Sequence, residues 1–296
     1  MSRKRQEWTF DGKGERVSAD TFQLSTRDLT PDDMNVVFQP IVETGTGKQH
    51  AVEALARCKR GVFRDPTILF KQAVADRAAG HLGRVVRDVA FARCTGTVVY
   101  VNIHPDELSS RWLVRPDDPI NFHDADVYLE ITETAAFQYF DLCQSVLREV
   151  CSRVGAHLVI DDFGAGYSNL KRVVDLEPAV VKLDRELVTG IDRHPRQREL
   201  IRYVVQLCEG LGARVVAEGI ETVDELEAVR EVGVHYVQGY LLARPGYPIP
   251  EVDWPLTASG RRRPTARPAP QSADIGAPRR TYGDAATGAR GLRRRR

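Results

Sequence analysis

The chain has 296 residues, of which 42% are apolar and 28% are charged, so it has enough apolar material for a sizeable core. This composition excludes a chain that is disordered throughout. No apolar run approaches the roughly 20 residues that span a bilayer, and the polar N-terminus lacks the apolar core of a secretory signal. We therefore expect a cytoplasmic protein. The five cysteines form no C-x-x-C pair and are expected to be reduced thiols.

The formal net charge of +1 combines an acidic body with a basic tail. Residues 260–296 contain 11 arginines and two aspartates, so residues 1–259 hold 31 basic and 39 acidic side chains. The tail has too few large apolar residues to offset its ordering entropy. We expect an irregular N-terminal segment (1–29), a folded domain (30–255) and a disordered tail (256–296). The tail is either a solvated appendage or a contact for an anionic partner.

Short β-branched runs alternate with amphipathic segments between these ends, which is the pattern of repeated β/α units. The predicted strands are 35–42, 50–57, 97–104, 126–132, 157–164, 179–184, 214–219 and 235–240. The predicted helices are 66–79, 82–94, 140–155, 196–212 and 223–233. Eight such strands predict an α/β fold with a parallel sheet that closes into a barrel, although an open doubly wound sheet would give a similar linear pattern.

At least one polar residue interrupts the apolar run of each predicted strand. In chain order these are Gln39, Glu53, Asn102, Glu130, Asp161 with Asp162, Lys182, Glu218 and Gln238. Buried carboxylates are costly unless a cation pairs with them, and oxygen ligands without histidine or cysteine favour Mg²⁺ or Mn²⁺ over zinc. Active sites of barrels lie at the C-terminal ends of the strands, so we expect these side chains to converge on a metal site there.

Taken one at a time, these residues have simpler interpretations. Glu53 or Glu218 at a strand end could cap a helix or pair with an arginine. Asp161 and Asp162 are more informative, because adjacent carboxylates repel each other unless a cation holds them together. The seven histidines show no metal-binding spacing, and no serine or cysteine lies in a nucleophile elbow, so covalent hydrolysis has no support from the residues.

Eight ordered segments closely resemble the EAL-domain family of cyclic di-GMP phosphodiesterases. They are FQPI (38–41), EALAR (53–57), VNIH (101–104), LEITET (129–134), IDDFGAGYSNL (160–170), VKLD (181–184), AEGIET (217–222) and VQGY (237–240). The resemblance implies a modified TIM (β/α)8 barrel with an antiparallel first strand. It also implies hydrolysis of cyclic di-GMP to linear 5′-pGpG with the help of two Mg²⁺ or Mn²⁺ ions.

The same resemblance implies a role for each matching residue. The implied metal ligands are Glu53, Asn102, Glu130, Asp161, Asp162 and Glu218. Lys182 is implied to hold the attacking water. In another account of the family, Glu218 is the general base. The candidate catalytic residues are Lys182, Glu218 and Glu53. The implied substrate contacts are Gln39, Leu55, Arg57 and Gln238. Glu133 and Glu221 are implied to support the site, and a homodimer is implied by the family alone.

This chain departs from the family pattern in two places. A tryptophan and a Pro-Gly turn commonly follow Arg57 in the family, whereas here residues 58–66 read CKRGVFRDP, and the N-x-S motif ends in His104. The complete set of metal residues favours an active phosphodiesterase. The alternative is a cyclic di-GMP receptor that signals to a protein partner, and a third hypothesis, with less support, is binding of DNA or RNA by the tail.

Overall fold

A computed structural model describes residues 8–10, 16–18, 25–109, 112–164 and 170–257 of the chain. Its strands are β1 (Trp8–Phe10), β2 (Arg16–Ser18), β3 (Met34–Glu43), β4 (Gln49–Cys58), β5 (Val99–Asn102), β6 (Val127–Thr132), β7 (His157–Phe163), β8 (Val180–Leu183), β9 (Arg214–Ala217) and β10 (Tyr236–Val237). Each of the strands β3 to β10 overlaps one of the eight predicted strands, although β5, β9 and β10 are shorter than predicted. The antiparallel pair β1 and β2 lies within the segment that was predicted to be irregular.

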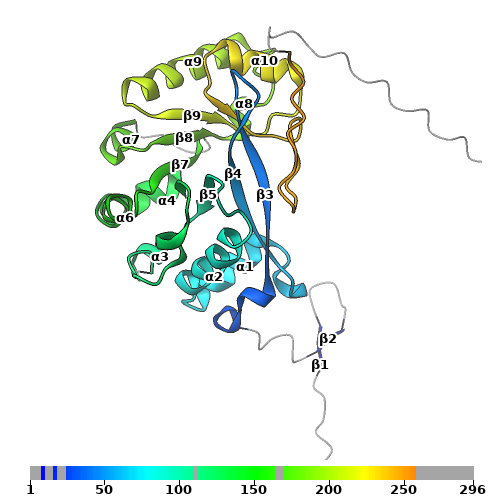
Figure 1. The fold of residues 1–296 in the computed structure, drawn as a ribbon, viewed down its shortest axis with the longest axis vertical. Helices are drawn as coiled ribbons and strands as arrows, with labels where there is room; N and C mark the ends of the chain where they lie inside the picture. The colour runs from blue at the N-terminus through cyan, green and yellow to red at the C-terminus, as the bar shows by residue number, and fades with distance from the viewer. Residues whose placement is uncertain (1–7, 11–15, 19–24, 110–111, 165–169, 258–296) are drawn as a thin grey trace, which may run out of the picture. The chain divides into compact units, whose positions relative to one another are not determined.

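The eight strands β3 to β10 close into a barrel in the order β10-β3-β4-β5-β6-β7-β8-β9. Consecutive strands from β4 to β10 pair in parallel, whereas β3 is antiparallel to both of its neighbours, β4 and β10. The long β3 and β4 run side by side through the barrel wall (Figure 1). Closure confirms the predicted barrel over the open sheet, and β3 is the antiparallel first strand that the resemblance implied.

Helices cover the outside of the barrel strands (Figure 1). They are α1 (Pro66–Ala75), α2 (Ala79–Phe91), α3 (Pro105–Ser109), α4 (Glu133–Gln138), α5 (Phe140–Leu142), α6 (Arg148–Val154), α7 (Leu170–Leu176), α8 (Arg185–Val188), α9 (Pro195–Gly210) and α10 (Val223–Glu231), with short 3-10 turns at 26–28, 31–33, 61–63 and 119–122. The predicted helix 140–155 consists of α5, a π-helical turn over Cys143–Leu147 and α6. The short helices α3, α4, α7 and α8 were not predicted.

Alternation along the strands explains why polar side chains gather at one end of the barrel. Every second residue of a barrel strand faces the interior. The lower interior layer consists of Ile41, Ala51, Tyr100, Val159, Val180 and Val216, with Tyr128 and Tyr236 packed against it. The barrel mouth is the end at which the parallel strands have their C-terminal ends. The polar residue that interrupted each apolar run lies two positions from the apolar layer, on the side of the mouth. On β3 this residue, Gln39, precedes Ile41 because that strand runs in the opposite direction.

Several sequence predictions concern the rest of the chain. Residues 258–296 lie outside the described part, so the disorder of the basic tail stays a prediction. Within the described part, no helix combines the length and apolar character needed to cross a membrane. The five cysteines are free thiols, as expected.

Candidate metal and active site

Lys182 lies at the centre of the polar layer. Its Nζ is 2.6 Å from Glu218 Oε1, 2.7 Å from Glu130 Oε1, 3.2 Å from Asp161 Oδ1 and 3.6 Å from Glu53 Oε2. The side chain of Lys182 is only 1% exposed and that of Glu130 is fully buried. Four carboxylates from four strands therefore share one ammonium group in surroundings that exclude most water.

Amide side chains also contact the carboxylates of this cluster. Asn102 Nδ2 donates to Glu53 Oε1 at 3.2 Å and to Glu130 Oε2 at 3.1 Å. Gln238 Nε2 donates to Glu53 Oε2 at 2.7 Å and to Gln39 Oε1 at 3.2 Å. Both oxygens of Glu53 are thereby fixed in direction. The structure brings together Gln39, Glu53, Asn102, Glu130, Asp161 and Lys182, one from each of β3 to β8, with Glu218 and Gln238, which directly follow β9 and β10.

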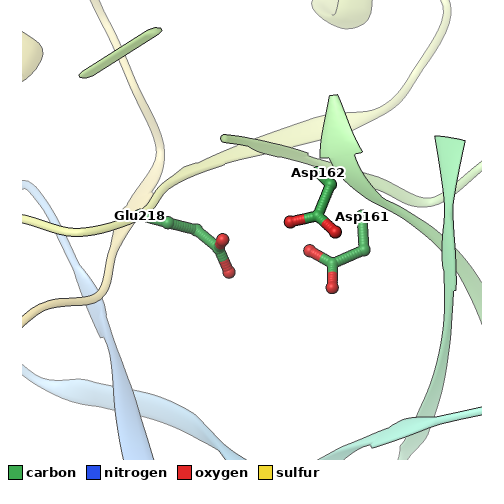
Figure 2. Close-up of side chains that lie close together, drawn as sticks. All are labelled: Asp161, Asp162 and Glu218. Carbon is green, nitrogen blue, oxygen red and sulfur yellow. The ribbon is translucent and has the colours of Figure 1, made fainter. Parts of the chain in front are cut away.

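Asp162 joins the cluster because the backbone of β7 departs from regular strand geometry. Adjacent residues of a regular strand point to opposite faces. Here the pairing of β7 with β8 shifts register between Ile160 and Phe163, and Asp162 has a left-handed φ of 54°. Figure 2 shows the Asp161 and Asp162 carboxylates side by side, with Glu218 facing them. One oxygen from each of these three residues lies within 4.8 Å of the others, a spacing that could hold a metal ion.

Burial and neighbouring carboxylates raise the pKa values of several acids in this cluster. Burial raises the pKa of Glu218 to about 8, against the attraction of Lys182. Burial and the neighbouring Asp161 raise the pKa of Asp162 to about 6, and burial raises that of Glu130 well above its usual range. The pKa of Lys182 is raised although burial opposes this, because the surrounding carboxylates stabilise the ammonium form.

The donor set of the cluster fits divalent cations. The cluster contains five carboxylates (Glu53, Glu130, Asp161, Asp162 and Glu218) and one ammonium group, so when fully ionised it carries an excess of four negative charges. Two divalent cations would balance this excess. The ligand atoms are carboxylate and amide oxygens, which are hard donors that suit Mg²⁺, Mn²⁺ or Ca²⁺.

The predicted supporting residues lie around the cluster. Glu133 is buried, and its Oε2 accepts a hydrogen bond from the backbone N–H of Gly164 at 2.9 Å, which ties the start of α4 to the end of β7. Glu221 pairs with Arg185 at 2.9 Å on the rim of the site. Glu133 thus contacts the end of β7 and Glu221 lies at the rim, and their supporting roles stay a prediction.

A cavity of about 320 Å³ opens above the cluster. Its lining includes Gln39, Glu53, Leu55, Asp161, Asp162, Lys182, Glu218 and Gln238. Arg185, Gly219, Gly239 and Tyr240 also line it and were not singled out from the sequence as site residues. Of the predicted substrate contacts, Arg57 does not line this cavity. It lines a second cavity, to which Leu55 also contributes.

Similarity to known proteins agrees with this geometry. The family model described as EAL domain matches residues 24–245. The cyclic di-GMP phosphodiesterase PdeR of Escherichia coli (strain K12) is 31% identical over 231 residues, which cover 73% of this chain and 34% of PdeR. The chain belongs to the EAL domain family, as its motifs had indicated. It spans about a third of the length of the first curated relatives it matches.

Solved structures of BlrP1 from Klebsiella pneumoniae share the fold. Its complex with calcium and cyclic di-GMP at pH 8.0 has a TM-score of 0.65 and 30% identity, and covers 75% of this chain and 58% of that chain. Its complex with manganese and cyclic di-GMP at pH 6 has a TM-score of 0.64 and 31% identity, covering 72% of this chain and 56% of that chain. The modified TIM barrel of EAL type is thereby confirmed.

Proposed function

We propose that this chain is a cyclic di-GMP phosphodiesterase that hydrolyses its substrate to linear 5′-pGpG with two Mg²⁺ or Mn²⁺ ions. The single observation that carries the proposal is the convergence of four carboxylates on Lys182 at the barrel mouth, with the Asp162 carboxylate beside two of them. The relatives and the BlrP1 complexes named above support the choice of substrate. The proposed ligands are Glu53, Asn102, Glu130, Asp161, Asp162 and Glu218.

Lys182 and Glu218 have separate roles in the proposed hydrolysis. Bound divalent ions would lower the pKa of a water and polarise the scissile phosphoryl group. Lys182 holds that water and offsets the charge that develops on the phosphoryl oxygens. Glu218, 2.6 Å from the Lys182 ammonium, accepts the water proton. The new P–O bond replaces the bond from phosphorus to the 3′ oxygen, which keeps the electron pair and takes up a proton from solvent to become a hydroxyl.

The amides and the supporting residues keep the acids in place. Gln238 and Asn102 fix the two oxygens of Glu53, and Glu133 holds the backbone at Gly164. The substrate contacts are proposed to be Gln39, Leu55, Arg57 and Gln238, with Arg57 on a phosphate in the second cavity. Glu221 positions Arg185 at the rim.

Incubation of the purified protein with cyclic di-GMP and Mn²⁺ or Mg²⁺, followed by chromatography, tests the proposal. Wild type should form linear 5′-pGpG, and Glu53→Gln should lower turnover at least about 100-fold, because even outer-shell partners of a metal site contribute about 10- to 100-fold. Glu149→Gln is the matched control, since Glu149 is 56% exposed and pairs only with Arg153 in the described part of the chain.

Two results would contradict the proposal. Equal turnover by wild type and Glu53→Gln would show that the carboxylate cluster is not the site of reaction. Tight binding of cyclic di-GMP by wild type without any linear product would instead indicate the receptor, the other function considered for this fold.

A further inference from the structure

The second cavity, of about 360 Å³, adjoins the metal site because Leu55 lines both. Its walls include apolar side chains of Phe70, Val86 and Ile103, and its polar lining residues are Arg57, Asn102, His104 and Thr132. We propose that His104 is a substrate-binding residue, donating a hydrogen bond from Nε2–H to a phosphodiester oxygen in the half of cyclic di-GMP that lies away from the metal site. This inference rests on the proposed function.

The hydrogen bonds of His104 fix which ring nitrogen can donate. Nδ1 of His104 accepts the backbone N–H of Asp106 at 3.2 Å, at the start of α3. A neutral imidazole that accepts at Nδ1 carries its proton on Nε2. The side chain is 33% exposed, so it is accessible to a ligand in the cavity that it lines. His104 therefore presents one donor of defined position.

A buried charge network holds the loop that carries His104. The backbone N–H of His104 donates to Glu107 Oε1 at 3.0 Å, and Glu107 Oε2 accepts from Arg87 Nη1 at 2.7 Å. Arg87 also pairs with Asp118 at 2.7 Å, and all three side chains are at most 1% exposed. Helix α2 approaches closely here, because a Cβ at Gly83 would lie 2.1 Å from Glu107 Oε2. This anchoring reduces the ordering entropy that a ligand contact would otherwise cost.

The charge of the second cavity favours an anionic group. None of its lining residues in the described part of the chain carries a carboxylate, in contrast to the first cavity. Arg57 adds a permanent positive charge, and its Nη1 donates to the neighbouring backbone oxygen of Ala56 at 2.8 Å. A phosphodiester oxygen accepts well from arginine and imidazole donors, and such charge-assisted bonds are the stronger class. Arg57 and His104 thus give the cavity two donors that suit an anionic oxygen better than an uncharged group.

Two substitutions at His104 separate the ligand contact from the helix contact. In His104→Asn, the side-chain oxygen can replace Nδ1 as the acceptor for the Asp106 N–H, but the Nε2 donor is lost. In His104→Gln, the amide nitrogen can replace Nε2 as the donor, but the acceptor for Asp106 is lost. Binding of cyclic di-GMP is measured by calorimetry with Ca²⁺, KM and kcat are measured with Mn²⁺, and the apparent Mn²⁺ affinity and melting temperature are measured for each protein.

We expect His104→Asn to weaken binding of cyclic di-GMP and to raise KM about tenfold or more, with kcat and Mn²⁺ affinity unchanged. His104→Gln should recover most of that affinity. Wild-type affinity in His104→Asn would overturn the inference, as would a parallel loss of Mn²⁺ affinity, which would mean that His104 acts only through the fold of the Asn102 loop. Failure of wild type to bind cyclic di-GMP would overturn the proposed function itself.

Discussion

Replacement of Lys182 by methionine tests whether one ammonium group stabilises the carboxylates of the barrel mouth. Its Nζ lies 2.6 Å from Glu218 and 2.7 Å from Glu130 in nearly closed surroundings. Removing one partner of a buried ion pair costs about 3–5 kcal/mol. At low pH the cost should be smaller, because burial raises the pKa of Glu218 to about 8 and raises that of Glu130, so both acids can be neutral without the lysine.

Urea unfolding in the presence of a chelator measures this effect. We expect Lys182→Met to lower the free energy of unfolding by about 3–5 kcal/mol at about pH 9 and by clearly less at about pH 5. Lys171→Met is the control, because Lys171 is 82% exposed and its pair with Asp175 is a surface contact of about 0.5 kcal/mol or less. A loss that is the same at both pH values, or no loss, would refute the electrostatic account of the cluster.

Two further predictions follow from the buried charges. Burial raises the pKa of Glu218 to about 8 and that of Asp162 to about 6. The protonated carboxyls therefore contribute their full stability below the pKa values of the unfolded chain, and this contribution is lost as the pH rises through 6 to 8. Calorimetry of the metal-free protein should show a melting temperature that falls over that pH interval. Mn²⁺ should raise the melting temperature more at about pH 8 than at about pH 5. An equal rise at the two pH values would contradict this prediction. Arg87→Met should lower the free energy of urea unfolding by about 3–5 kcal/mol, because it removes the guanidinium that pairs with the buried Glu107 and Asp118. A loss below about 1 kcal/mol would show that these acids are neutral in the folded protein.

The barrel and its polar layer were predictable from the sequence because both depend on strand periodicity. The β-branched runs mark all eight strands, and the polar interruptions fall at the interior positions nearest the mouth. Convergence of Glu53, Glu130, Asp161 and Glu218 on Lys182 follows once the sheet closes, since the strand ends then meet in one ring. The eight EAL-family motifs add the roles of individual residues, which periodicity alone does not give.

Other features depend on contacts that leave no local pattern. The helices α3 and α8 are only five and four residues long, too short to show a helical period. Arg87 lies in an amphipathic helix where its sequence context resembles that of a solvent-exposed arginine, yet it is fully buried between acids that follow 20 and 31 residues later. Tyr240 lines the first cavity only because the chain turns after β10. Such features require the three-dimensional structure.

The binding of divalent cations by the carboxylate cluster is the central claim, and anomalous scattering from crystals soaked in Mn²⁺ and cyclic di-GMP tests it directly. We predict two peaks at the barrel mouth, each within coordination distance of carboxylate oxygens among Glu53, Glu130, Asp161, Asp162 and Glu218. Anomalous peaks only at other places on the protein would contradict cation binding by this cluster. An ordered nucleotide over the cluster without any metal peak would contradict it as well.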